Sequence, residues 1–136
     1  MLHLTKVAFG AQSVDHLAER LAARAAAGPL FLTTRYLPKR HAEIAGPDTD
    51  GGSLYWILKH QLVARSPILG FGEAPEGKVA ILIGMPLIAV RPMPKRAHQG
   101  WRYRAAADAP ADLAVGERGE TLPAGLAREL AALALL

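Results

Sequence analysis

Residues 13–29 have the pattern of one amphipathic α-helix. Apolar side chains recur at the spacing that places them on a single helical face, namely Val14, Leu17, Ala18, Leu21, Ala22 and Ala25. Ser13 is a favourable N-cap, Asp15 in the first turn suits the helix dipole, and Gly28 followed by Pro29 is a typical stop. A helix with one apolar face must bury that face, so the rest of the chain has to supply the layer on which it packs.

The other apolar segments are short, rich in β-branched and aromatic residues, and separated by glycine and proline. They predict strands at residues 2–9, 30–37, 53–65, 67–71, 79–83, 85–91 and 101–104. The first half of segment 53–65 is apolar at every position, which indicates a buried central strand. Pro92 and Pro94 restrict their own segment to a sheet edge. A short helix is predicted at residues 39–45, with Pro38 at its start, and a last helix from about Pro123.

This order of elements predicts a single α+β domain over residues 1–136. Strands clustered after one early helix favour a curved mixed sheet or partial β-barrel. We expect an N-terminal crossover helix and a C-terminal helix to pack against this sheet. A chain of 136 residues is long enough to bury one core.

Several classes of site are excluded by what the sequence lacks. There is no cysteine, so disulfides, thiolate nucleophiles and cysteine-ligated metals are ruled out. The histidines are scattered, with no pair at a ligand spacing, at His3, His16, His41, His60 and His98. No G-x-S-x-G elbow, P-loop or G-x-G-x-x-G fingerprint occurs. We therefore expect no metal site and no cofactor.

The sequence also gives no sign of export or of a membrane span. The first eleven residues include His3 and Lys6 and contain no unbroken apolar run. The longest uncharged run covers residues 79–90, whereas a spanning helix needs about 20 residues. We expect a cytoplasmic protein without membrane contact.

Three motifs run through the chain: GGSLYW at residues 51–56, QGWRY at 99–103 and DAPADL at 108–113. Together they resemble a small uncharacterised family of alphaproteobacterial proteins with a domain of unknown function, and the resemblance covers nearly the whole chain. It implies no catalytic residue, because the family has no assigned activity. The element order is also similar to that of PUA-like and ASCH-like β-barrels, which bind RNA or modified nucleosides. That second resemblance implies a related fold and is a weak guide to function.

Positive charge is concentrated in the middle of the chain. Residues 35–104 contain eleven Lys and Arg residues against five acids, while the whole chain has a net charge of +4. A surplus of this kind favours an anionic partner such as RNA or another polyanion.

Two groups of residues are the candidate ligand-binding positions. The first lies in the stretch 91–104, which holds no acid, and consists of Arg91, Lys95, Arg96, His98, Trp101, Arg102, Tyr103 and Arg104. The second surrounds the start of the predicted short helix and consists of Arg35, Lys39 and Arg40, with His41 beside them. Guanidinium groups grip phosphate and aromatic rings stack on bases. An anion on the backbone N–H groups after Pro38 would explain the second group; alternatively, these cations are exposed and simply tolerated there. Alternatively, Trp101 and Tyr103 are core residues on one strand face, and the arginines beside them are solvated.

These observations predict a nucleic-acid-binding module with a basic, aromatic-lined face, and RNA is the expected ligand. Two alternatives stay open. One is a small enzyme acting on a nucleoside-like or anionic small molecule, with Lys59, His60 or Arg65 as candidate catalytic residues. The other is a homodimeric interaction protein that uses its leucine-rich C-terminal helix and takes no small ligand.

Overall fold

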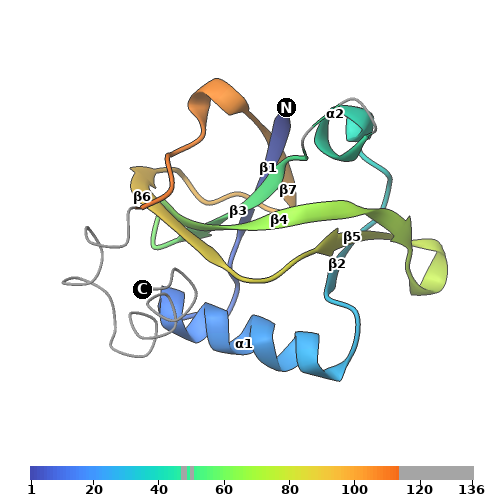
Figure 1. Cartoon of the computed structure of the whole chain (residues 1–136), viewed down its shortest axis with the longest axis horizontal. Helices are drawn as coiled ribbons and strands as arrows, with labels where there is room; N and C mark the ends of the chain where they lie inside the picture. Colours follow the sequence, from blue (N-terminus) through green and yellow to red (C-terminus); the bar gives the residue numbers. More distant parts are fainter. Residues whose placement is uncertain (47–48, 50, 114–136) are drawn as a thin grey trace.

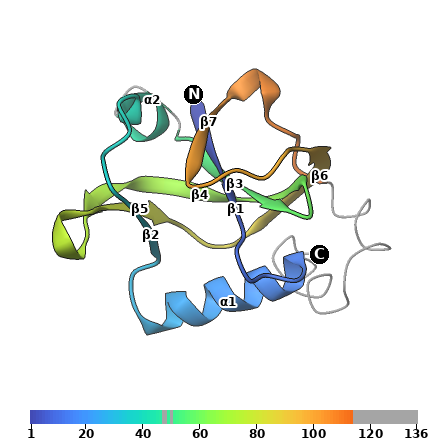
Figure 2. The same cartoon turned by 180° about the vertical axis from the view of Figure 1, so that it is seen from behind.

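A curved, open sheet of seven strands with two α-helices forms the part of the chain that the computed structural model describes, residues 1–46, 49 and 51–113 (Figures 1 and 2). The predicted α+β class and mixed sheet are confirmed. The elements are β1 (Leu2–Val7), α1 (Val14–Ala27), β2 (Phe31–Thr34), α2 (His41–Ala45), β3 (Ser53–Leu58), β4 (Gln61–Glu73), η1 (Pro75–Gly77), β5 (Val79–Ile83), β6 (Ile88–Pro94), β7 (Trp101–Ala105) and η2 (Ala106–Asp108). The predicted C-terminal helix lies outside the described residues.

The strand order is β2-β5-β4-β3-β1-β7, and β6 pairs separately with β4. The β1–β3 pair is parallel, and the other strand pairs are antiparallel. The long strand β4 belongs to both halves of the sheet, as Figure 1 shows. Its first residues lie between β3 and β6, and residues 68–73 pair with β5. Because β4 changes its pairing partners along its length, the sheet can curve.

Helix α1 lies along one side of the sheet in both views (Figures 1 and 2). The predicted cap is confirmed, because the Ser13 hydroxyl accepts a hydrogen bond from the backbone N–H of His16 at 3.0 Å. Leu17 and Leu21 from the predicted apolar face are buried in the main core. The helix connects β1 to β2 at the far end of the sheet, and the parallel partner β3 follows only after β2 and α2.

The predicted strand 53–65 is wrong, because a two-residue turn divides it. Lys59 and His60 both have positive φ, 52° and 62°, and they close a tight hairpin between β3 and β4. The central position predicted for its first half is confirmed, since β3 lies between β1 and β4. Segment 67–71 is also not a separate strand. It continues β4, and Pro67 is tolerated where β4 leaves β3 and joins β5.

Helix α2 begins at His41, two residues later than predicted. The His41 backbone N–H donates to the carbonyl of Pro38 at 3.1 Å, so the chain turns before the helix starts. The predicted edge position of Pro92 and Pro94 is confirmed, because they lie in β6, whose only strand partner in the described region is β4.

Candidate ligand groove between the ends of the sheet

Strands β2 and β7 are the two ends of the strand order, and side chains hold them together. The indole Nε1–H of Trp101 donates to the Thr34 hydroxyl at 3.0 Å. Indole groups that are partly buried usually have such a partner. The curved sheet is therefore joined at this point by a side-chain contact, which we call the seam.

A groove of about 460 Å³ lies at the seam. It is lined by Thr34, Arg35, Tyr36, Leu37, Pro38, Lys39, Trp101 and Tyr103. Its volume falls within the range of small-ligand sites, about 300–1,000 Å³. The groove thus brings residues from both predicted groups of ligand-binding positions into one concavity.

Aromatic rings supply much of the groove surface. Tyr36 is 71% exposed and lines the groove, so its ring is accessible to a ligand. Trp101 and Tyr103 are half-buried and meet edge-on, with ring centroids 4.9 Å apart and planes at 67°. Both pack partly against the main core, so the core alternative for these two residues is correct in part.

Three cations lie beside these rings. Arg35 stands 5.5 Å from the ring centre of Tyr36, and Lys39 is exposed on the groove wall. Arg40 stands 5.5 Å from the ring centre of Tyr103 and also forms a bidentate pair with Glu43, with both contacts at 2.7 Å. That hydrogen-bonded pair raises the pKa of Arg40 and lowers the pKa of Glu43. Among the described residues, Arg35 and Lys39 have no carboxylate partner and can meet an external anion.

Two of the backbone N–H groups after Pro38, those of Arg40 and His41, are occupied within the protein. The N–H of Arg40 donates to the Tyr103 hydroxyl at 3.1 Å, and that of His41 donates to Pro38. The prediction of an anion held by these N–H groups is therefore not supported. The hydrogen bond of Arg40 instead ties the start of α2 to β7.

The other predicted positions lie away from the groove. Side chains alternate along β7, so Arg102 and Arg104 lie on the opposite side from Trp101. Arg104 donates to the carbonyl of Asp108 at 2.8 Å and contacts the sulfur of Met93. His98 shares a hydrogen bond of 2.8 Å with the Thr5 hydroxyl, and burial is the main cause of its lowered pKa.

Of the remaining basic positions of the stretch 91–104, Arg91 and Arg96 are exposed and Lys95 is partly buried. Arg91 lies on β6, and Lys95 and Arg96 follow this strand. None of the three lines the groove. The basic stretch is therefore divided between two sides of the sheet. This division agrees with the alternative drawn from the alternation of Trp, Arg, Tyr and Arg, in which the aromatic residues and the arginines lie on opposite faces.

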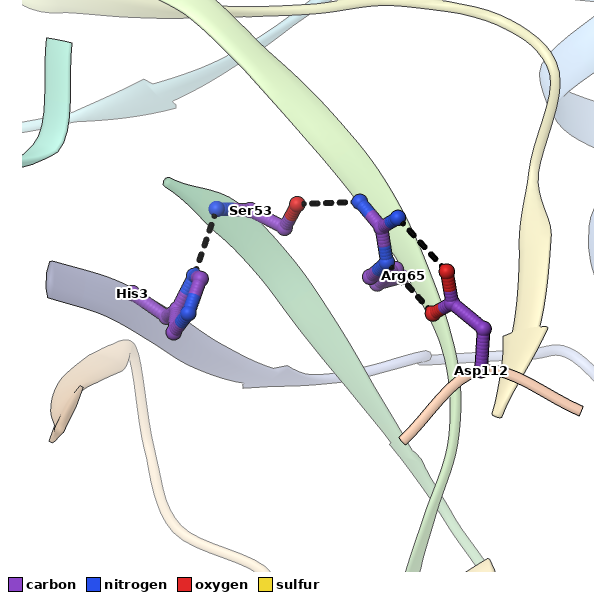
Figure 3. A network of polar contacts seen from close by, with 4 residues as sticks. All are labelled: His3, Ser53, Arg65 and Asp112. Carbon is purple, nitrogen blue, oxygen red and sulfur yellow. Dashed lines mark hydrogen bonds and ion pairs between the residues drawn. The ribbon is translucent and has the colours of Figure 1, made fainter. Parts of the chain in front are cut away.

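The three catalytic candidates are not brought together. Lys59 and His60 lie exposed in the hairpin turn, whereas the guanidinium of Arg65 is bound in a polar network (Figure 3). Arg65 donates to both carboxylate oxygens of Asp112, at 2.8 and 2.9 Å, and to the Ser53 hydroxyl at 2.8 Å. The hydrogen bonds with Asp112 raise the pKa of Arg65 and lower the pKa of Asp112.

Sequence reasoning missed two members of this network, His3 and Asp112. The Nδ1 atom of His3 accepts the backbone N–H of Ser53 at 2.8 Å, and its ring is buried. The available signal was a histidine between Leu2 and Leu4, both of which are apolar, in a strand whose two faces are covered. Asp112 lies in the DAPADL motif, and nothing local identifies its partner 47 residues away.

Within residues 1–46, 49 and 51–113, no group of His, Asp and Glu side chains could hold a metal ion. None of the helices in the same region is long and apolar enough to cross a membrane.

Comparison with known proteins gives one match. The model of a family described as "Protein of unknown function (DUF1489)" matches residues 4–136. No curated protein and no solved structure matches the chain.

Proposed function

Because the chain belongs to the DUF1489 family, whose description assigns no function, we propose a function from its own geometry: it binds single-stranded nucleic acid, RNA in particular, in the groove at the seam. One observation carries this proposal. The groove places three aromatic rings beside two cations that have no carboxylate partner in the described region. The expected membership of a family of unknown function is itself confirmed by the match.

The chemistry of the groove suits an unpaired nucleotide. Bases of single-stranded RNA stack on aromatic side chains, and Tyr36 offers the most exposed ring in the groove. Arg35 and Lys39 stand on the same wall and can contact the phosphates that flank a stacked base. A groove of about 460 Å³ accepts a group of nucleotide size, and its aromatic rings can stack on bases only where these bases are unpaired. The ligand is therefore a short single-stranded segment.

The similarity of the element order to PUA-like and ASCH-like barrels supports the same proposal. Proteins of those folds bind RNA or modified nucleosides, although a shared fold alone is a weak argument for a shared ligand. A cytoplasmic location, where RNA is available, forms part of the proposal.

The test measures affinity for a fluorescently labelled single-stranded RNA by anisotropy across a salt series. Each lost phosphate contact lowers the slope of log K against log salt by about 0.7 for single strands. Arg35→Gln and Lys39→Gln should each reduce the slope by about this amount. Lys78→Gln is the matched control, because Lys78 is exposed and does not line the groove.

Two results decide against the proposal. One is the absence of measurable binding to single-stranded RNA or DNA at low salt. The other is an equal loss of slope in Lys78→Gln, which would show that binding follows net charge and does not depend on the groove. A duplex of the same sequence should bind more weakly than the single strand.

A further inference from the structure

A second cavity lies on the face of the sheet opposite to the groove. Its volume is about 480 Å³, and His3, Ser53, Tyr55 and Arg65 contribute to its walls. The register pairs His3 with Arg104 and its neighbour Leu4 with Tyr103, so His3 and Tyr103 lie on opposite faces. Residues 109–112 also line this cavity, and Figure 3 shows Asp112 beside Arg65 at its wall. The site shares no residue with the groove.

His3 presents a buried hydrogen-bond donor to the cavity. His3 is 5% exposed, and its Nδ1 atom already accepts a hydrogen bond from the backbone N–H of Ser53. In the neutral ring the proton is then on Nε2, which has no partner among the described residues. Burial, followed by the charge of Arg65, lowers the pKa of His3 and keeps the ring neutral at pH 7.

Tyr55 supplies a second buried donor. The residue is 4% exposed, its ring meets the ring of His3 edge-on at 5.0 Å, and its hydroxyl has no hydrogen-bond partner in the described part of the chain. Burial raises the pKa of this phenol, so the hydroxyl keeps its proton at neutral pH. A buried hydroxyl without a partner is unfavourable unless water or a ligand satisfies it.

Arg65 and Ser53 add further donors beside these two. Asp112 and Ser53 take three of the N–H groups of the Arg65 guanidinium, which leaves the others to a ligand. Because the Ser53 oxygen accepts from Arg65, its own O–H is available as a donor. The cavity therefore presents four side-chain groups able to donate, and Asp112 is its one carboxylate among the described residues.

Gly52 holds this arrangement in place. A Cβ atom at Gly52 would overlap the backbone carbonyl oxygen of Leu2, so only glycine lets this segment approach β1. The close approach is what allows the N–H of Ser53 to reach His3. The backbone of Gly52 is also fixed on both sides, by hydrogen bonds to Ile44 and from Ile68. The donors are thus positioned before any ligand arrives.

We propose that this cavity binds a small organic carboxylate, whose oxygens accept hydrogen bonds from the four donor side chains, His3, Ser53, Tyr55 and Arg65. A site rich in donors selects a ligand rich in acceptors. Asp112 is paired with Arg65 at the wall of this cavity, so an anion that enters meets one carboxylate as well as the donors, and this carboxylate repels a doubly charged phosphate more than a singly charged ligand. A singly charged carboxylate meets donors without that second charge.

The test uses nuclear magnetic resonance of the full chain, labelled with ¹⁵N. Monocarboxylates from acetate to benzoate are titrated, each against its own primary amide, and inorganic phosphate is a further arm. We expect carboxylates to shift the His3 Nε2 resonance and the backbone resonances of Gly52 and Ser53, and we expect the amides to leave them unchanged. Equal binding of amides, or tighter binding of phosphate than of any carboxylate, would overturn the proposal.

The matched variant is Tyr55→Phe, which keeps the ring and removes one donor. It should weaken carboxylate binding about fivefold, the effect of losing one hydrogen bond. Tyr103→Phe removes a hydroxyl from the other face and should leave the affinity unchanged. If Tyr55→Phe does not fold, Ser53→Ala replaces it, with the same expected loss. Unchanged affinity in the folded variant contradicts the proposal.

Discussion

Trp101 and Thr34 lie 67 residues apart in sequence and share a hydrogen bond of 3.0 Å. Their strands, β7 and β2, are the two ends of the strand order and are not paired through their backbones. The side-chain contact therefore joins the two ends of the sheet, which in a closed barrel are joined by backbone hydrogen bonds. It also places the chain after β2 next to the aromatic side of β7, which is how the groove arises.

Thr34→Val should destabilise the protein by about 1–2 kcal/mol, because the half-buried indole N–H of Trp101 loses its acceptor while the volume of the side chain is kept. The free energy of unfolding in urea measures the effect. Thr33→Val, at an exposed position of the same strand, is the control and should change stability by less than about 0.5 kcal/mol. Equal effects of the two substitutions would mean that the seam contact contributes nothing.

Tyr36→Ala should weaken binding of single-stranded RNA about tenfold to a hundredfold, because it removes the most exposed stacking surface of the groove. Tyr36→Phe keeps the ring and should bind like the parent. The side chain is 71% exposed, so neither substitution should change the melting temperature measurably. Anisotropy with a labelled oligonucleotide provides the affinities. If both variants bind like the parent, stacking at Tyr36 is not part of recognition.

Elements with a local signal were predictable from the sequence. The cap at Ser13, the apolar face with Leu17 and Leu21, and the stop at Gly28 identify α1 without any tertiary information. The apolar run that forms β3 likewise indicated a central strand. In each case the energetic reason for the element lies within a few neighbouring residues.

Features that depend on distant partners were not predictable. The hairpin turn at Lys59 and His60 contains no Gly, Asn or Asp, so its positive φ values leave no signal in the sequence. The pairing of Arg65 with Asp112 is set by the folding of residues 109–113 over the sheet, and no pattern specifies it. The two groups of candidate ligand positions were identified separately. Their meeting at the groove depends on the sheet order, which the sequence leaves open.

Asp112→Asn should reduce the decrease in the free energy of unfolding that the parent protein shows as the pH becomes acidic. Arg65 lowers the pKa of Asp112 in the folded protein, so the unfolded chain takes up this proton first as the pH falls below about 4. The contribution of the ion pair is present above that range and is lost as the pH falls through the lowered pKa. At neutral pH the variant should be less stable by about 1 kcal/mol, measured by urea unfolding. Glu43→Gln removes an exposed pair and should leave neutral-pH stability nearly unchanged; an equal loss there would contradict the assignment.

His3→Gln should remove part of the loss of stability between pH 7.5 and 5. The pKa of His3 is lowered in the folded state, chiefly by burial, so below about pH 6.5 the unfolded chain binds the proton more readily. The resulting stability is present above that pH and falls as the pH decreases. His98 is shifted in the same direction, so His98→Gln should remove a separate share of the slope. A slope in His3→Gln identical to that of the parent protein would show that His3 does not titrate in this range.

Gly52→Ala tests whether the approach of residues 51–53 to β1 is required. The added Cβ would overlap the carbonyl oxygen of Leu2, and a backbone atom in a central strand cannot move aside as a flexible side chain can. We expect a destabilisation of about 3 kcal/mol, the upper part of the range for overpacked sites. The backbone amide of Ser53 should also shift in the nuclear magnetic resonance spectrum, because its hydrogen bond to His3 depends on this approach. Gly72→Ala is the matched control, since its Cβ would make only an ordinary contact with Leu82 at 3.9 Å. Similar stabilities for the two alanine variants would show that the segment can retreat from β1, and the carboxylate site would then lack its fixed geometry.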